Sequence, residues 1–240
     1  MKITCHASGS GGNFYVLEGG KEKLFLEAGV SYKKLKNFVN FDFENVVGCL
    51  LSHEHKDHSY AIGKLADNGI DCYMSQGTSD ALWIESHRII IVKPEIGFRV
   101  GNEWNVIGLK TQHDCNEPLG YLVYNRVTKK KLLFITDTYY FRYKIPGLTH
   151  LMIEANYDFG ILQDNIDKGI VYPTLKSRIT RSHFEISNVK EFLRKNDKSK
   201  LEQVILIHIS SNNGNPFAFK KSVEEVVDCS VHIATEGLII

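Results

Sequence analysis

The sequence predicts an α/β protein that folds as one domain over residues 1–240. Two observations lead to this expectation. Short apolar runs bounded by glycine or polar residues alternate with segments of helical periodicity, which is the order of strands and helices in α/β proteins. The chain length and a hydrophobic content of 43% also suffice for one large core.

The apolar runs predict strands along most of the chain. The run over residues 46–51, just before the first histidines, is almost continuously apolar, as expected for a strand buried on both faces. The full set of expected strands covers residues 14–17, 24–26, 46–51, 89–92, 104–110, 120–124, 131–136, 151–154, 204–209 and 231–234.

Two segments predict helices, and a third predicts a loop. Residues 59–68 carry apolar side chains on one helical face, and Gly69 follows as a stop. Residues 187–195 have the same periodicity, with Ser187 as the expected N-cap. Residues 156–181 show little periodicity, so we expect a long loop of the kind that is usually functional or mobile.

The charge of the chain is nearly balanced. Lys and Arg total 29 and Asp and Glu total 28, which gives a formal net charge of +1. Domains that bind nucleic acid usually carry a basic excess, so this balance argues against a long polyanion as the main partner. A basic cluster is nevertheless present within residues 176–181.

The cysteines and the apolar runs indicate a cytoplasmic location. Five cysteines without a Cys-x-x-Cys pair argue against a disulfide framework and against a zinc ribbon. The N-terminus lacks the apolar core of a signal peptide. No run approaches the roughly 18 apolar residues of a membrane span, so we expect no membrane partner.

Four potential metal ligands, His53, His55, Asp57 and His58, directly follow the strand expected over residues 46–51. Alternate side chains of an extended segment share one face, so two imidazoles can bind one ion. The turn that follows offers a carboxylate and a third imidazole to a second ion. These donors suit zinc, manganese or iron. A solvated histidine-rich turn is the weaker alternative.

Three further candidate ligands, His113, Asp137 and His208, lie at or near the ends of expected strands. The C-terminal edge of strands is where sites in α/β sheets are usually built. Each of the three alone would more often be structural, and a histidine among apolar residues, such as His208, is usually a hydrogen-bonded core residue. Together with the first cluster they complete two coordination shells.

This pattern, His-x-His-x-Asp-His followed by a later His, Asp and His, resembles the metallo-β-lactamase superfamily over nearly the whole chain. The opening segment Ala7-Ser8-Gly9-Ser10-Gly11-Gly12-Asn13 is similar to a ribonuclease Z-like subgroup of bacteria and phages. The segments around His113, Asp137 and Glu154 fit the same subgroup. It contains single-domain exonuclease-like hydrolases and the phage anti-Pycsar proteins, which destroy cyclic nucleotide messengers. The resemblance implies an αββα sandwich.

The resemblance also implies two divalent metal ions, with zinc expected first and manganese as the alternative. It divides the ligands between the ions: His53, His55 and His113 for one, Asp57, His58 and His208 for the other, and Asp137 as a bridge. Asp57 is counted among the catalytic residues as well. A two-metal site activates water for attack on phosphorus. A homodimer is implied by the resemblance alone.

His183 is the expected general acid, because it resembles an extra histidine that ribonuclease Z-like phosphodiesterases have and lactamases lack. The alternative is a surface histidine before a helix. Two positions depart from the family pattern. Glu27 stands where Asp is usual, which puts the position of the metal-binding loop or the choice of metal in doubt. Tyr157 stands where relatives often have His, so this position does not offer the imidazole that those relatives have there.

Two enzymatic functions follow as expectations. The first is hydrolysis of a small cyclic nucleotide, a 3',5'-cyclic mononucleotide opened to the 5'-monophosphate, as in a phage anti-defence enzyme. The alternative is a metal-dependent DNA or RNA exonuclease or a ribonuclease Z-like nuclease. A non-catalytic binding module is a third hypothesis, and the complete ligand set argues against it.

Two other features leave alternatives open. Six aromatic residues either form a base-stacking face or belong to the core or a dimer contact: Tyr139, Tyr140, Phe141, Tyr157, Phe159 and Tyr172. Residues 8–13 are glycine-rich but lack the Gly-Lys-Ser/Thr ending of a phosphate-binding loop. We expect a tight turn there, which could line the mouth of the site.

Overall fold

The computed structural model describes residues 1–240, and the chain divides into two compact units. The first unit comprises Met1–Lys110, Cys115–Lys130 and Thr235–Ile240. The second comprises Thr111–Asp114 and Lys131–Ala234. The expectation of one domain stays a prediction.

The first unit contains a six-stranded sheet in which the strands follow sequence order. Its strands are β1 (Lys2–Ala7), β2 (Phe14–Gly19), β3 (Glu22–Leu26), β4 (Val46–Leu50), β5 (Cys72–Met74) and β6 (Ile89–Ile91). The strands β1 to β3 pair antiparallel, and β3 to β6 pair parallel. Because β3 and β4 are parallel, the residues that follow them reach the same edge of the sheet.

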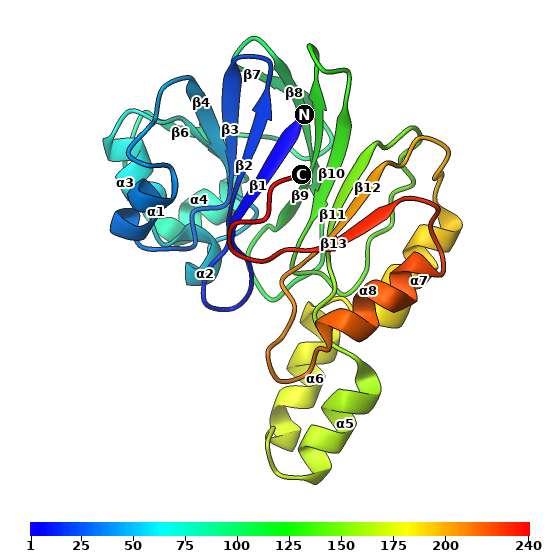
Figure 1. Ribbon diagram of the computed structural model, residues 1–240. Helices are drawn as coiled ribbons and strands as arrows, with labels where there is room; N and C mark the ends of the chain where they lie inside the picture. Colours follow the sequence, from blue (N-terminus) through cyan, green and yellow to red (C-terminus); the bar gives the residue numbers. More distant parts are fainter. The chain divides into compact units, whose positions relative to one another are not determined.

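Four helices belong to the first unit, and Figure 1 shows three of them, α1, α3 and α4, beside the six-stranded sheet. The helices are α1 (Tyr32–Phe38), α2 (Lys56–Ser59), α3 (Ile62–Asp67) and α4 (Gln76–Leu82). The helix expected over residues 59–68 is found as the shorter helix α3, and α2 is a separate turn before it. Apolar side chains of α1 and α3, among them Leu35, Ile62 and Leu65, are buried in one cluster with Phe14 and Phe25. Burial of this face stabilises helices that are too short to be stable alone.

Three antiparallel strands complete the first unit: β7 (Gly97–Val100), β8 (Trp104–Lys110) and β9 (Leu119–Asn125). The bounds of β8 agree with the prediction from the sequence. Alternate residues of β8 are buried, including Trp104 and Val106, which is the pattern of a strand with one buried face.

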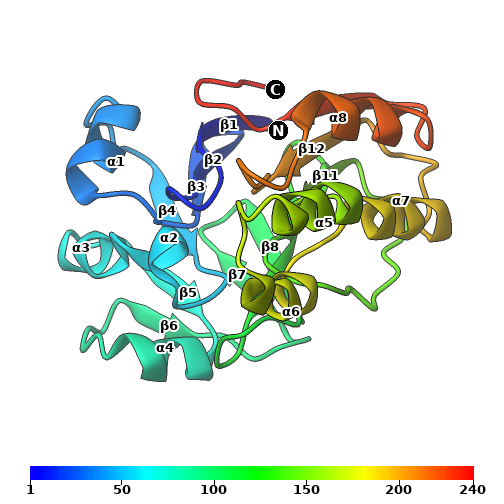
Figure 2. The same cartoon turned by 90° about the horizontal axis from the view of Figure 1, so that it is seen from below.

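The second unit is built on four parallel strands in the order β13, β12, β11, β10. They are β10 (Lys131–Ile135), β11 (His150–Glu154), β12 (Gln203–Ile207) and β13 (Ser230–Ile233). Residues that follow β10, β11 and β12 therefore come to one common edge. The helices α7 (Ile186–Lys195) and α8 (Pro216–Glu224) contact each other (Figure 2), and α8 also contacts β13.

The prediction of a loop over residues 156–181 is wrong, because two helices occupy most of this segment: α5 (Phe159–Asp167) and α6 (Pro173–Ser182). Asp158 caps α5 by accepting a hydrogen bond from the Ile161 N–H, and Pro173 begins α6. The two helices lie side by side (Figure 1) around a small cluster that includes Leu162, Ile166 and Ile179. Their apolar faces are narrow, which hides the helical period in the sequence.

A smaller correction concerns α7. Its N-cap is Glu185 rather than Ser187, because the Glu185 carboxylate accepts hydrogen bonds from the N–H groups of Ser187 and Asn188. All five cysteines are free. None of the helices is both long and apolar enough to span a membrane.

Candidate metal centre

The first unit carries the ligand-rich segment directly after β4. His55 is the N-cap of α2, and Asp57 and His58 lie in its first turn. The ring centroid of His53 lies 4.7 Å from that of His55 and 4.2 Å from that of His58. The Nε2 atom of His58 lies 3.4 Å from Oδ2 of Asp57. Three imidazoles and one carboxylate are therefore gathered at one strand end. We call these four residues the first cluster.

A buried carboxylate, Glu27, holds the first cluster from the neighbouring strand. Glu27 follows β3, and its Oε1 atom accepts a hydrogen bond of 3.1 Å from the Ser52 N–H. Its Oε2 atom lies 3.2 Å from Nδ1 of His58. Complete burial raises the pKa of Glu27, and the hydrogen bonds from His58 and Ser52 oppose this effect. The glutamate that departs from the family pattern thus still contacts the metal-binding loop.

The glycine-rich turn over residues 8–13 also supports the ligand-rich segment, through Asn13. The backbone and side-chain amides of Asn13 donate to the Asp57 carbonyl at 2.8 Å and 3.0 Å. The Nδ2 atom of Asn13 also lies 3.3 Å from Nε2 of His58. A Cβ atom on Gly29 would lie 1.7 Å from the Asp57 carbonyl oxygen, so only glycine fits there. Sequence reasoning missed this supporting role of Asn13.

The second unit gathers a second set of ligands from separate segments: His113, Asp137, Glu154, His183 and His208. We call these five residues the second cluster. Asp137 lies among three histidines: its Oδ2 atom is 3.7 Å from Nε2 of His113, and its Oδ1 atom is 3.5 Å from Nε2 of His208 and 3.6 Å from Nδ1 of His183. Donor atoms of the last four residues lie within 4.8 Å of one another.

Glu154, the last residue of β11, is the common hydrogen-bond acceptor of the second cluster. Its Oε2 atom accepts from the backbone N–H groups of Thr138 at 3.1 Å and Phe184 at 3.0 Å. Its Oε1 atom lies 2.7 Å from Nδ1 of His183. Burial raises the pKa of Glu154, and the charge of His183 opposes the shift. No role was predicted for Glu154, although a carboxylate that ends a fully buried strand is a usable signal.

The imidazoles of the second cluster have different electrostatic surroundings. Burial lowers the pKa of His113, and its Nδ1–H donates to the Ser182 carbonyl at 2.8 Å, which directs Nε2 toward Asp137. Burial also disfavours a charged His183. The negative charge of Glu154, together with hydrogen bonds to Asp137 and Glu154, outweighs burial and raises the pKa of His183 to about 10.

Three residues of the site have left-handed backbone conformations within two residues of the end of a strand. The φ angles are 63° at Glu27, 42° at Asp137 and 52° at His208. Residues other than glycine rarely adopt this conformation, and where they do it often marks a functional site. Sequence reasoning placed His208 inside a strand, whereas β12 ends at Ile207 and the turn at His208 directs its ring toward Asp137.

The six aromatic residues proposed as a stacking face or as core separate into two groups. Phe141 and Tyr157 are buried, at 5% and 3% exposure, and Tyr157 packs in a small apolar cluster. Four rings are exposed: Tyr139, Tyr140, Phe159 and Tyr172. Tyr139 also lines a polar hollow with His113, Arg178 and Arg181.

No protein-family profile matches the chain. Its structure is similar to that of the metallo-β-lactamase fold protein YhfI from Bacillus subtilis, with a TM-score of 0.77 at 18% sequence identity over 100% of this chain and 98% of that one. The chain has the metallo-β-lactamase fold. The fold class predicted from the sequence is thereby confirmed, as is the resemblance on which it was based.

Two bacterial relatives align with most of this chain. Exodeoxyribonuclease WalJ of Streptococcus pneumoniae is 29% identical over 89% of this chain and 83% of its own length. Exodeoxyribonuclease YycJ of Bacillus anthracis is 29% identical over 92% of this chain and 87% of its own.

The donors of each cluster fit a divalent cation, because imidazole nitrogen and carboxylate oxygen are the ligands that such ions take. The clusters differ from the predicted ligand set in one respect, since Glu154 and His183 also offer donor atoms next to Asp137. The division of ligands between two ions, the identity of the metal, the cytoplasmic location and the homodimer stay predictions.

Proposed function

We propose that the protein is a metal-dependent hydrolase of phosphodiester bonds. The observation that carries the proposal is the position of His183, whose Nδ1 atom lies 2.7 Å from Glu154 and 3.6 Å from Asp137. A histidine fixed by a buried carboxylate beside metal-type donors is equipped to deliver a proton to a leaving oxygen. The names of the curated relatives support the same class of reaction.

The proposed metal ligands come from both clusters: His53, His55, Asp57, His58, His113, Asp137 and His208. Bound divalent ions would activate a water molecule and neutralise charge on the phosphoryl oxygens. Asp57, a quarter exposed at its side chain, belongs to both the ligands and the catalytic residues in this proposal. Glu27 and Ser182 orient ligands through the Nδ1 atoms of His58 and His113, which leaves Nε2 of His58 near Asp57 and Nε2 of His113 near Asp137.

His183 acts as the general acid in this proposal. Its Nδ1 atom is engaged by Glu154, so Nε2 is the atom that faces a substrate. Hydrogen bonding of one ring nitrogen to a carboxylate fixes the orientation of the ring and stabilises its charged form. The proton for the leaving oxygen thus comes from a group whose orientation the protein sets in advance.

The relatives favour DNA as the substrate, and we propose an exodeoxyribonuclease as the first candidate. Hydrolysis of a cyclic mononucleotide, the function expected first from the motifs, becomes the second candidate. The nearly neutral net charge favours it, because a small substrate needs no extended basic surface.

A substrate panel tests the proposal. Purified protein is freed of metal by chelation and then supplied with zinc or manganese. Single-stranded and duplex DNA, a tRNA precursor, cyclic mononucleotides, cyclic dinucleotides and bis(p-nitrophenyl) phosphate are assayed in parallel. We expect metal-dependent hydrolysis with release of mononucleotides from DNA ends. Absence of hydrolysis of every phosphodiester by metal-loaded protein would contradict the proposal, and preference for a cyclic mononucleotide would select the second candidate.

Two variants separate the acid from the bridging ligand. His183→Ala should retain bound metal and lower kcat by about 10²–10⁴-fold, the usual contribution of a general acid. Asp137→Ala should lose metal, as measured by elemental analysis. His232→Ala is the matched control, because this histidine of β13 bonds Gln203 outside the cluster. Unchanged turnover of His183→Ala would rule out the acid role, and loss of metal from it would make His183 a ligand.

A further inference from the structure

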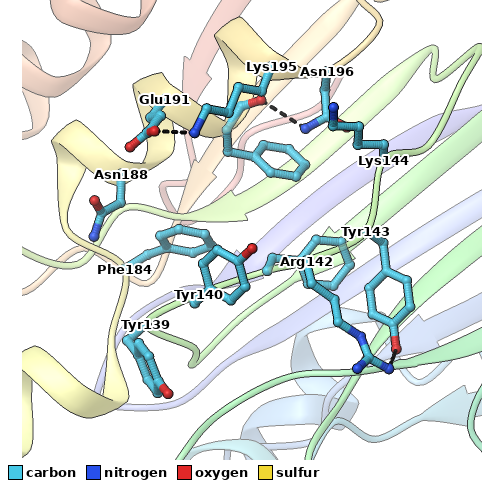
Figure 3. A pocket seen from close by; sticks show the side chains of 12 residues that line it. Tyr139, Tyr140, Arg142, Tyr143, Lys144, Phe184, Asn188, Glu191, Lys195 and Asn196 are labelled. Carbon is cyan, nitrogen blue, oxygen red and sulfur yellow. Dashed lines mark hydrogen bonds and ion pairs between the residues drawn. The ribbon is translucent and has the colours of Figure 1, made fainter.

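An aromatic pocket of about 320 Å³ lies in the second unit, between the segment after β10 and helix α7 (Figure 3). Three buried rings, Phe141, Phe184 and Phe192, form part of its lining. The rings of Phe141 and Phe192 meet edge to face, with centroids 5.9 Å apart. Three tyrosines, Tyr139, Tyr140 and Tyr143, add rings to the same pocket. The wall is thus built from aromatic rings in several orientations.

The rim of this pocket is positively charged. Arg142, Lys144 and Lys195 border it, against one acidic residue, Glu191. Glu191 and Lys195 form an ion pair on α7, so the net positive charge of the lining comes from Arg142 and Lys144. The Arg142 guanidinium lies 4.9 Å from the centre of the Tyr143 ring and donates a hydrogen bond of 3.0 Å to the Tyr143 hydroxyl. Arg142 and Lys144 are both exposed.

The pocket is connected through the backbone to the second cluster. Phe184 directly follows His183, and one carboxylate, that of Glu154, bonds both the His183 ring and the Phe184 N–H. On the other wall, Tyr140 is fixed by Thr138, whose hydroxyl donates to the Tyr140 carbonyl at 2.8 Å. The same Thr138 bonds Glu154 through its N–H group. The two walls are therefore positioned by residues that also position the candidate general acid.

We propose that this pocket binds one nucleobase of a single-stranded nucleic acid, adjacent to the phosphodiester that is cleaved. The inference rests on the proposed function and assigns its substrate as a strand rather than a free cyclic mononucleotide. Proteins bind single strands by stacking bases on aromatic side chains while cations pair with phosphates. The volume is at the lower end of the range for small-molecule sites, which suits one planar base. The rim cations match the phosphates on either side of that base.

Tyr140 is the residue to test, because it is 54% exposed and its backbone, rather than its ring, makes the contacts with Thr138. The probes are a fluorescent oligothymidylate and an oligomer of the same length with abasic sites, both titrated into chelated protein by anisotropy. Tyr140→Ala should weaken oligothymidylate binding by roughly 5- to 150-fold, the usual effect of removing one stacking ring. The abasic oligomer should bind parent and variant equally, and more weakly than oligothymidylate binds the parent.

Two further variants control the measurement. Tyr140→Phe keeps the ring and should bind like the parent. Phe217→Ala removes an exposed aromatic side chain of α8 outside the pocket and should also bind like the parent. In metal-loaded protein, Tyr140→Ala should lower the ratio of kcat/KM on DNA to that on bis(p-nitrophenyl) phosphate, which has no base.

The outcomes separate this inference from the proposed function. Equal binding of the two oligomers by the parent, absence of binding, or an unchanged affinity of Tyr140→Ala would overturn the pocket assignment, even if phosphodiesters are hydrolysed. Base-dependent binding that Tyr140→Ala weakens would support the pocket, even if metal-loaded protein hydrolyses no phosphodiester and the proposed function fails.

Discussion

The two clusters of candidate ligands are assembled in different ways. In the first unit, four ligands lie within one short segment after β4, and the supporting residues Glu27 and Asn13 contact that segment from outside. In the second unit, each ligand comes from a different segment, and a single buried carboxylate, Glu154, forms three hydrogen bonds with two of the other segments.

This difference shows whether local conformation or the packing of distant segments determines the geometry of each cluster. The first cluster is largely a local conformation, because a strand end and one helical turn already bring its ligands together. The second cluster exists only when several strands and loops are in register. Removal of its common acceptor should therefore destabilise the fold more than removal of one support of the first cluster.

The largest effect is expected from Glu154→Ala. Removing one partner of a buried charged pair leaves the other uncompensated and typically costs about 3–5 kcal/mol. The variant should lose that much free energy of unfolding, measured by urea denaturation of chelated protein. Glu154→Gln, which keeps an acceptor oxygen, should lose less. A stability of Glu154→Ala within about 0.5 kcal/mol of the parent would show that the cluster is held together elsewhere.

A smaller effect is expected from Glu27→Gln in the first unit. The amide keeps the length of the side chain and an acceptor for the Ser52 N–H, but it removes the charge beside His58. Loss of such a supporting carboxylate usually lowers metal affinity by about 10–100-fold. Metal affinity is measured by competition with a chromogenic chelator. Glu27→Asp, which restores the family's usual residue, is the control, and an affinity of Glu27→Gln equal to the parent's contradicts the role.

The smallest effect is expected from Asn13→Ala. Its buried side chain accepts from the Gly9 N–H at 2.9 Å and donates to the carbonyls of Gly9 and Asp57. Loss of these bonds should cost about 1–3 kcal/mol of unfolding free energy, because buried polar groups are left unpaired. Asn13→Asp keeps the acceptor alone and should lie between parent and alanine in the same urea titration. Equal stability of all three proteins would mean that the backbone of the turn suffices.

The same contrast explains what could be predicted from the sequence. The spacing of the first cluster is visible because its ligands are neighbours in the chain, and strand β8 is visible as a short run rich in apolar residues. The role of Glu154 was not visible, since its partners Thr138, His183 and Phe184 are distant in sequence and meet it only after folding.

The helices α5 and α6 were missed for a related physical reason. Their buried residues are few, and Leu162, Ile166 and Ile179 pack mainly in a small cluster between the helices. Most other residues of α6 are polar or basic and exposed. Helical periodicity is strong only where a wide face is buried, as in α7 with Val189, Phe192 and Leu193.

The left-handed turns after the strands have a consequence for protein design. Asp and His are among the residues that tolerate this conformation best, so at Asp137 and His208 the backbone and the ligand chemistry select the same amino acids. At Glu27 they diverge, because glutamate has no such preference. A designer who transplants this centre into another scaffold must therefore copy the turn that follows each strand together with the side chain, since the same residues on straight strands would point their donor atoms elsewhere.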